Sequence, residues 1–269
     1  MGNRLALLCL VCCGGLAVAD PARFGCQQPL SLAYFRFGSL YYLDQNDQPA
    51  GVDVELAREL EQRSGCRLRG RELSRVLIWQ LLENGQLDMA TAGLPTPERE
   101  RFGLFLPYLV SRNRFLLPNS LAGRIDSPEA FLADRSLRMG VVRSFRHGAE
   151  YDRLIGRLAT EGRIEEASDI ETLFRWLRLN RIQGMVAHPL VAGHLLKLNG
   201  LDGLVVQYDW NGSEPPLLGG WILSRRRFNA AQLAAWSMLF DGIRQDGTLE
   251  KIYRNYVSPR EARELTPKP

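Results

Sequence analysis

The sequence predicts an α/β fold with parallel strands, organised as two units of similar size. Short apolar runs alternate with helical patterns along the chain, which is typical of strands connected by helices. In each unit a strand is followed by a loop that leads into a helix. The sequence shows neither an exact repeat nor a low-complexity tract.

The first unit is predicted from strand-like runs and helix boundary residues. "LSLAY" reads as a strand, Asp53 caps a helix, and Gly65 stands at the end of that helix. The predicted elements are, in order, strand 30–34, helix 53–65, strand 68–73, helix 76–84, strand 87–91, a helix beginning at Thr96 and an extended connection over 114–117.

The second unit begins near Ser127 and Pro128, a second N-cap and proline pair. The elements expected from there on are strand 137–142, helix 149–160, a short strand within 162–167, a helix capped by Ser168, strand 184–188, helix 189–196, strand 219–224, helix 228–244 and helix 247–256. We expect the polar residues 261–269 to be frayed.

The first 19 residues have the composition of a secretory signal peptide. Arg4 precedes the apolar run Leu5–Val11, and Ala17-Val18-Ala19 forms a small-x-small cleavage site. We place the cut after Ala19, which leaves 250 of the 269 residues as a soluble, periplasmic protein without a lipid anchor. No later run has the length of a transmembrane helix.

Removing residues 1–19 leaves two of the five cysteines, Cys26 and Cys66. Two cysteines in an oxidising compartment suggest a disulfide. They stand just before the first and second predicted strands, whose starts would meet at one edge of a parallel sheet. A loop of this length would be stabilised by about 4 kcal/mol on the chain-entropy model. The alternative is two unpaired thiols.

Composition excludes several classes of function. The net charge of +4 falls to +3 once Arg4 is removed, which is too weak and too evenly spread for nucleic-acid binding. The only dense basic run, Arg225–Arg227, reads as a solvated surface. The three histidines match no zinc spacing, so we expect neither a metal nor a cofactor.

A resemblance to a known family rests on motifs in a fixed order. They are "GVDVELAREL" (51–60), Trp79, "NGQLDMATAG" (84–93), "TPERERF" (96–102), "PY" (107–108), "MGVVRSF" (139–145), "RIQGMVAH" (181–188) and "DGTLEKIYRNY" (246–256). In this order the chain resembles the family 3 extracellular solute-binding proteins, the polar amino acid-binding components of bacterial ABC importers. The likeness covers nearly the whole mature chain.

The resemblance implies a bilobed clamshell of two Rossmann-like α/β lobes joined by two hinge strands. Lobe one would comprise 20–113 and 218–269, and lobe two 114–217. A small ligand would bind in the cleft, and the lobes would close around it. The family implies a monomer whose partner is an inner-membrane ABC permease or a membrane receptor.

Arg99 is the first candidate binding residue. Thr96 and Pro97 begin a helix, yet Arg99 falls in its first turn, where the helix dipole disfavours a cation by about 0.3–1 kcal/mol. In the family, the arginine at this position of the T-x-x-R motif holds the ligand carboxylate, which a guanidinium matches bidentately. Without the resemblance, Arg99 would pair with a nearby glutamate on the surface.

The remaining candidates come from the loops that would face the cleft. Phe37 and Tyr41 are expected to form aromatic walls, whereas Tyr34, Trp79 and Trp221 are expected in the core. The other predicted site residues are Thr91, Gly93, Ser144, Phe145 and Arg146, with packing as the alternative for Phe145.

Three departures from the family pattern bear on the ligand. Leu94-Pro95 removes a hydroxyl donor, and the loop Arg143–His147 is bulkier and more cationic than usual. His188 stands where amino acid binders carry the aspartate for the ligand ammonium. We therefore predict an anionic, carboxylate-bearing ligand, with His188 donating to an oxygen, or else serving as a core-edge residue with a backbone partner.

Arg36, Arg99, Arg143, Arg146 and His188 could all lie near the cleft, although two of the four arginines should face solvent.

The predicted function is capture of this ligand for ABC-type import, without enzymatic activity. The sequence has no phosphate-binding loop and no GxSxG nucleophile motif. The enzymatic alternative is a cyclohexadienyl dehydratase of the same fold, with His188 as general acid beside Arg99. The other alternative is a ligand-sensing subunit of a membrane receptor.

Overall fold

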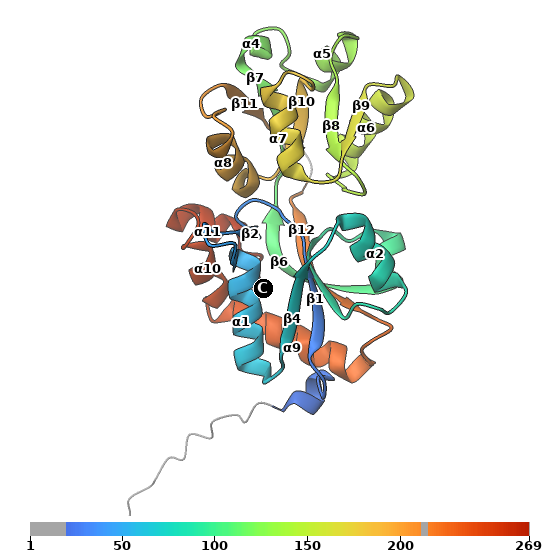
Figure 1. The fold of residues 1–269 in the computed structure, drawn as a ribbon, viewed down its shortest axis with the longest axis vertical. Coiled ribbons are helices and arrows are strands. Elements are labelled where there is room, and N and C mark those ends of the chain that lie inside the picture. The colour runs from blue at the N-terminus through green and yellow to red at the C-terminus, as the bar shows by residue number, and fades with distance from the viewer. Residues whose placement is uncertain (1–19, 211–214, 269) are drawn as a thin grey trace, which may run out of the picture.

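The structure, a computed structural model of the chain, describes residues 20–210 and 215–268. Residues 1–19, where we predict a signal peptide, lie outside these ranges. The described chain forms two α/β units, one above the other in Figure 1, which confirms the predicted bilobed fold. We call the lower unit lobe one and the upper unit lobe two. Within the described ranges, no helix is long and apolar enough to cross a membrane.

Lobe one is built on a five-stranded sheet in the order β4-β1-β5-β12-β6. Its strands are β1 (Leu30–Tyr34), β4 (Leu68–Glu72), β5 (Met89–Gly93), β6 (Gly103–Ser111) and β12 (Leu217–Ser224). β1 is parallel to β4 and β5, whereas β12 is antiparallel to β5 and β6. Lobe one is therefore made from two distant segments of the chain.

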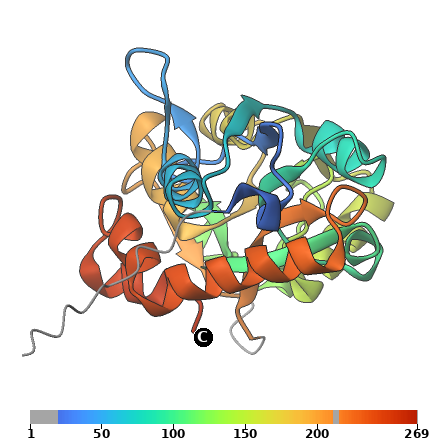
Figure 2. The ribbon, with the colours of Figure 1, turned by 90° about the horizontal axis from the view of Figure 1, so that it is seen from below.

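Helices cover both faces of this sheet (Figure 1). They are η1 (Pro21–Phe24), α1 (Val52–Ser64), α2 (Arg75–Glu83), α3 (Pro97–Glu100), α9 (Ala230–Gln245), α10 (Thr248–Tyr253) and α11 (Pro259–Leu265). In Figure 2, which looks from below, α9 is the long orange helix that crosses the molecule. The core between these layers contains Leu32, Trp221 and Trp236, all fully buried. A small hairpin, β2 (Tyr42–Leu43) and β3 (Pro49–Ala50), precedes α1.

Lobe two repeats the architecture with the sheet order β11-β7-β10-β8-β9. Its strands are β7 (Arg114–Pro118), β8 (Met139–Val142), β9 (Ile164–Ala167), β10 (Gly184–Ala187) and β11 (Val205–Tyr208). Its helices are α4 (Asn119–Ala122), α5 (Pro128–Ala133), α6 (Ala149–Thr160), α7 (Ile170–Arg178) and α8 (Pro189–Leu198). The chain enters lobe two between β6 and β7 and returns between β11 and β12.

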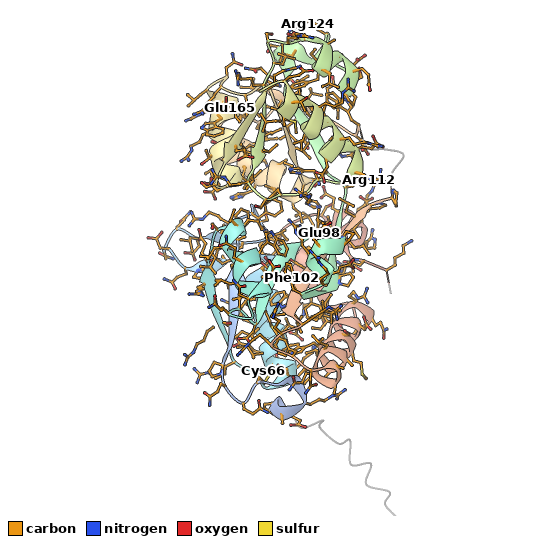
Figure 3. All side chains as sticks on the ribbon, turned by 90° about the vertical axis from the view of Figure 1, so that its right-hand side faces the viewer. Cys66, Glu98, Phe102, Arg112, Arg124 and Glu165 are labelled. Carbon is orange, nitrogen blue, oxygen red and sulfur yellow. A yellow bond between two sulfur atoms is a disulfide. The ribbon has the colours of Figure 1, made fainter. Side chains whose placement is uncertain are left out.

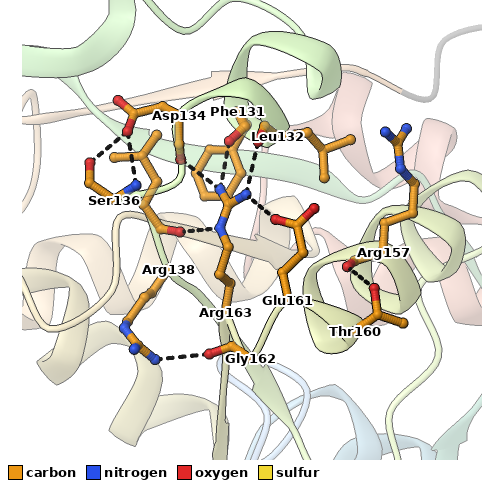
Figure 4. A network of polar contacts seen from close by, with 11 residues as sticks. Phe131, Leu132, Asp134, Ser136, Arg138, Arg157, Thr160, Glu161, Gly162 and Arg163 are labelled. Carbon is orange, nitrogen blue, oxygen red and sulfur yellow. Dashed lines mark hydrogen bonds and ion pairs between the residues drawn. The ribbon is translucent and has the colours of Figure 1, made fainter.

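A buried arginine forms hydrogen bonds with three segments of lobe two (Figure 4). Arg163, 5% exposed, donates hydrogen bonds to the carbonyl oxygens of Phe131, Leu132, Asp134 and Leu137, at 2.8–2.9 Å. It also pairs with Glu161 at 2.8 Å. Arg163 thus satisfies carbonyl groups at the end of α5, which the helix itself leaves without partners.

The structure confirms the predicted disulfide between Cys26 and Cys66. Their Cα atoms are 5.6 Å apart, because Cys26 precedes β1 and Cys66 precedes β4, two parallel neighbours in which Leu30 faces Leu68. The bond lies at the base of lobe one, where Figure 3 labels Cys66.

Several element predictions were wrong. Gly51 and not Asp53 is the N-cap of α1, Asp169 and not Ser168 is the N-cap of α7, and the strand predicted over 137–142 begins at Met139. Residues 261–265, part of the segment expected to be frayed, belong to α11 (Pro259–Leu265), because Ser258 and Glu261 make a reciprocal capping box. The strand predicted to begin at residue 87 begins at Met89. The carboxylate of Asp88 accepts hydrogen bonds from the backbone and hydroxyl of Ser31, at 2.8 and 2.7 Å, which fixes the turn that leads into β5.

Candidate functional site

A cavity of about 50 Å³ lies between the lobes. Loops at the carboxyl ends of β5, β8 and β10 form its walls, as expected for an α/β fold with parallel strands. The end of lobe one that bears α3 faces lobe two in Figure 3, where Glu98 of α3 is labelled. Side chains of both lobes close the space, so a larger ligand would need the lobes to move apart.

The charged side chains that line the cavity are of one sign. Arg75, Arg99 and Arg146 contribute guanidinium groups, and His147 and His188 contribute imidazoles. No aspartate or glutamate is among the described residues that line it. A negatively charged ligand would therefore find oppositely charged partners in the cavity wall. A positively charged ligand would find no carboxylate among the described residues that line it.

Arg99 lies across the opening between the lobes. Its guanidinium stacks on Trp79, 3.9 Å from the ring centroid, and donates to the carbonyl oxygens of Leu94 (3.0 Å) and Ser144 (2.8 Å). Ser144 belongs to lobe two, so this last bond joins the lobes. Burial, followed by repulsion from Arg146, lowers the pKa of Arg99 to about 10. Arg99 forms no ion pair with a carboxylate of the described residues, contrary to the surface alternative.

Arg75 is the most deeply buried guanidinium of the cavity, with 3% of its surface exposed. It donates one hydrogen bond, to the carbonyl oxygen of Thr91 at 3.0 Å. Its guanidinium carbon lies 4.4 Å from the ring centroid of Phe35 and 5.2 Å from that of Phe145. Burial, followed by the charge of Arg99, lowers the pKa of Arg75 to about 10.

A buried acid lies behind this wall, in lobe one. Asp53 is fully buried and accepts a hydrogen bond of 2.6 Å from the hydroxyl of Tyr108, which in turn accepts from the Ala92 N–H at 3.1 Å. Burial raises the pKa of Asp53 to about 6, although Thr91, Tyr108 and Arg75 oppose the rise. The network holds Ala92, a residue of the cavity wall, at a φ of 53°. Such strain costs about 1–3 kcal/mol and is concentrated at functional sites.

Aromatic side chains from the two lobes meet beside the cavity. Phe145 of lobe two contacts Phe35 and Phe37 of lobe one, with ring centroids 5.2 and 5.5 Å apart. Behind them, Gly38 packs so closely on α8 that a Cβ atom there would lie 2.7 Å from the Val191 Cα. The lobes are thus in direct apolar contact.

Both ring nitrogens of His188 are engaged by the backbone. Nδ1 accepts from the Leu190 N–H at 3.2 Å, which caps α8, so Nε2 carries the proton and donates to the Val110 carbonyl at 3.2 Å. Burial lowers the pKa of His188 to about 4, although the Val110 bond opposes this. His188 is therefore neutral at neutral pH, and it joins α8 to β6.

A family model matches residues 36–259, most of the chain. The protein belongs to the bacterial extracellular solute-binding proteins, family 3. This membership implies a location outside the cytoplasm. A comparison with curated protein sequences gives no match.

Solved structures share the fold of this family 3 protein. A histidine kinase sensor domain similar to periplasmic binding proteins superposes with a TM-score of 0.72 at 18% identity, covering 86% of this chain and 96% of that one. An ancestral arginine-binding protein bound to arginine gives 0.71 at 20% identity, covering 86% and 98%. The ancestral amino acid-binding protein AncCDT-1, a precursor of cyclohexadienyl dehydratase, gives 0.70 at 21% identity, covering 85% and 95%.

In this solute-binding protein, the cavity contains seven of the nine residues predicted for the site. They are Phe37, Gly93, Arg99, Ser144, Phe145, Arg146 and His188. Ser144 has a φ of 65°, so each lobe contributes a non-glycine residue with positive φ to the wall.

Two predicted site residues do not line the cavity of the solute-binding protein. Tyr41 is buried in the core of lobe one, stacked on Tyr34 with centroids 4.6 Å apart. Thr91 is fully buried behind the wall and reaches the site only through its carbonyl bond to Arg75. Arg36 and Arg143, also considered, pair instead with Glu72 and Glu166 at 3.0 and 3.5 Å.

Several residues that line the cavity are not among those predicted for the site, including Leu109, Asn113 and His147. Arg75 and Trp79 bear most on its chemistry. Arg75 was not considered, and Trp79, assigned to the core, lines the cavity and carries the Arg99 guanidinium. A signal for Arg75 was available: it follows the N-cap Ser74 in a first helical turn that contains no acidic residue. Arg99 likewise lies in a first helical turn, although Glu98 and Glu100 share that turn with it.

Proposed function

We propose that this family 3 protein binds a small carboxylate-bearing organic anion between its lobes and delivers it to an ABC import permease. The observation that carries the proposal is the composition of the cavity wall. Arg75 is buried and Arg99 half-buried there, and no carboxylate is among the described residues that line it. A guanidinium binds a carboxylate through two parallel hydrogen bonds. In a water-poor site such a pair contributes more than it does on a surface.

The charge of the cavity disfavours a standard α-amino acid as the ligand. An ammonium group buried there would meet three positively charged arginines, and the neutral His188 stands where the family's aspartate would receive it. A buried charge without a partner costs several kcal/mol. The arginine bound by one structural neighbour is a cation, so we expect the ligand class to differ in this chain.

A thermal-shift screen tests this proposal. The panel contains monocarboxylates, dicarboxylates, keto acids, acidic amino acids and the cationic amino acids arginine and lysine. We expect anions to raise the melting temperature of the protein, since a ligand at a hundred times its dissociation constant adds about 2.7 kcal/mol of stability. A preference for arginine or lysine would contradict the proposal.

The variant Arg99→Ala assigns the carboxylate site. Removing one partner of a buried charge pair should weaken binding of the best anion by about 2–5 kcal/mol, measured by titration calorimetry. Arg101→Ala is the matched control, because Arg101 is exposed just after the same short helix. Equal affinities of the two variants would remove Arg99 from the site.

The groups in the cavity favour binding over catalysis. The dehydratase alternative requires His188 as a general acid, but His188 has a pKa of about 4 and both of its nitrogens are engaged. A general acid works best with a pKa near the operating pH. Incubation with prephenate should therefore yield no phenylpyruvate.

Import and sensing would use the same cavity. One structural neighbour is a histidine kinase sensor domain, yet a likeness of the fold does not select that role. We favour import, as the family resemblance implies, by a periplasmic monomer cleaved after Ala19, with lobe boundaries near residues 113 and 217. Permease and ATPase genes beside this one would support import, whereas a kinase gene would support sensing.

A further inference from the structure

The proposed function leaves two guanidinium groups of the cavity without a role, those of Arg75 and Arg146. Arg146 is exposed to solvent, whereas Arg75 is buried. One arginine, Arg99, is sufficient to hold one carboxylate. Arg75 comes from a different helix, α2, and is more deeply buried, with 3% of its surface exposed. A second guanidinium at this depth needs its own explanation, because desolvating a charge costs several kcal/mol.

Packing accounts for only part of the surroundings of Arg75. The rings of Phe35, Phe145 and Trp79 lie 4.4, 5.2 and 5.9 Å from its guanidinium carbon and stabilise the cation through their faces. The Thr91 carbonyl accepts one of the five N–H groups that a guanidinium carries. Its Nε and Nη2 make no hydrogen bond with any described residue.

The nearest acid does not neutralise Arg75 by direct contact. Asp53 attracts it at a distance, but the Asp53 carboxylate accepts from the Tyr108 hydroxyl, and no ion pair joins Asp53 to Arg75. The Asp53 Oδ2 atom has no partner among the described residues at hydrogen-bonding geometry. Arg75 therefore has unused donors, and it lines the cavity.

Arg75 and Arg99 lie against the same indole. Their guanidinium carbons are 5.9 and 3.9 Å from the centroid of Trp79, and Arg99 is close enough to lower the pKa of Arg75. One short ligand can therefore reach both groups. The two guanidinium groups repel each other at this separation, so a ligand with two negative charges would stabilise the pair more than a ligand with one.

We propose that Arg75 forms a second anion subsite beside Arg99, and that the ligand is a short diacid without an ammonium group. This inference rests on the proposed function, since it divides the same cavity into two subsites. Arg99, at the opening between the lobes, holds one carboxylate, and Arg75, at the buried end, holds the other. A monocarboxylate would leave the donors of Arg75 unpaired.

The test compares succinate with succinamate, its half-amide, by titration calorimetry on the mature protein. The two probes have nearly the same shape but differ by one negative charge. We expect the wild type to bind succinate about tenfold more tightly or better, because hydrogen bonds between two charged groups are stronger than those to a neutral amide. Malonate and glutarate extend the comparison if succinate is too long or too short.

Arg75→Met removes the charge and retains an apolar side chain of similar length. It should reduce the preference for succinate over succinamate to near unity while succinamate still binds, whereas Arg99→Ala should weaken both. Arg71→Met is the matched control, because Arg71 is exposed on the edge strand β4. If Arg75→Met does not fold, Arg75→Lys keeps the charge without the bidentate geometry, and the preference should fall in the same direction.

The outcomes separate the two proposals. Equal affinity of the wild type for succinate and succinamate, or an unchanged preference in the Arg75 variants, would overturn the second subsite but leave anion binding intact. A lower melting temperature with the preference retained would make Arg75 a packing residue and also overturn it. If no acid of the panel binds, both proposals fail.

Discussion

Arg75 and Arg99 each lie in the first turn of a helix, where the helix dipole disfavours a cation. The Ser74 side chain caps α2 and the Thr96 side chain caps α3, each by accepting a hydrogen bond from a backbone N–H of the first turn. Neither cap uses an arginine side chain. The arginines are held instead by aromatic rings and carbonyl oxygens, which leave them charged. Both side chains are therefore placed where an incoming anion would offset an existing electrostatic cost.

Asp53 gives a prediction about pH. Its pKa is about 6 in the folded protein against a reference value of 3.8, so the folded state holds the proton more tightly than the unfolded state. The contribution of Asp53 to stability is greatest below pH 4 and decreases as the pH rises through 6. The variant Asp53→Asn would not titrate at this position. The free energy of unfolding of the wild type minus that of Asp53→Asn should therefore fall by about 2 kcal/mol between pH 4 and pH 7.

Urea unfolding of both proteins at several pH values measures this difference. The comparison between the two proteins cancels the opposite effect of His147 and His188, whose pKa values of about 4 make the fold less stable as the pH falls below about 6.5. A difference that stays constant from pH 4 to pH 7 would show that Asp53 keeps an ordinary pKa.

Arg99 could be found from the sequence, whereas Arg75 is marked there only by its place in a first helical turn, and the position of Tyr41 is not marked at all. Arg99 stands in a motif whose order is specific. The burial of Arg75 depends on Phe35 and Phe145, which only the closed arrangement of the two lobes brings together. Tyr41 turns into the core because Gly38 has a φ of 55° and the segment folds back on itself, so strand alternation does not apply.

At the scale of elements, Arg163 is the residue on which several segments of lobe two depend. Arg163→Met would remove the guanidinium donor from four carbonyl groups and from Glu161, although the Asp134 carbonyl would keep the Leu137 N–H. We expect the free energy of unfolding to fall by about 3 kcal/mol or more, because buried acceptors lose their partners. Urea unfolding followed by circular dichroism measures the loss.

Arg157→Met is the control for this prediction. Arg157, labelled in Figure 4, is exposed on α6 and makes no contact with the carbonyls that Arg163 binds. Equal stability of the two variants would mean that water satisfies the carbonyl groups as well as Arg163 does.

Most elements could be predicted from the sequence, because caps and apolar periods are local. β1 and α6 have the bounds expected, and β7 is one residue longer than its predicted segment. Two of the failures occur where a distant residue sets the boundary, whereas α11 begins at its own local capping box. Ser31 fixes the turn before β5, and the unpredicted strand β6 pairs with β12, more than a hundred residues away in the sequence.

At the scale of the whole molecule, Gly38 controls how closely the lobes approach. A Cβ atom at this position would lie 2.7 Å from the Val191 Cα of the other lobe. Gly38→Ala should therefore hold the lobes apart and weaken binding of the best anion by about tenfold or more, since a ligand binds more weakly when its closed state is less populated. Small-angle X-ray scattering with saturating ligand should show a larger radius of gyration than for the wild type.

Gly162→Ala separates this effect from backbone strain. Gly162 has a φ of 66°, close to the 55° of Gly38, but no atom of the described residues lies within 4 Å of the place that an alanine methyl group would take there. Both variants carry the cost of a left-handed alanine, and only Gly38→Ala meets the other lobe. If both bind the anion alike, the contact at Gly38 does not limit closure.

The central place of β12 determines when each lobe can be completed as the chain emerges from the membrane during the export that we predict. All strands of lobe two, from β7 to β11, precede β12 in the chain. In lobe one, β6 joins the sheet only through β12, which lies between β5 and β6. A nascent chain that has emerged as far as β11 therefore carries one finished lobe and one with two unpaired strand edges, the kind of surface that aggregates. Anything that shields those edges until the last fifth of the chain arrives would raise the yield of native protein.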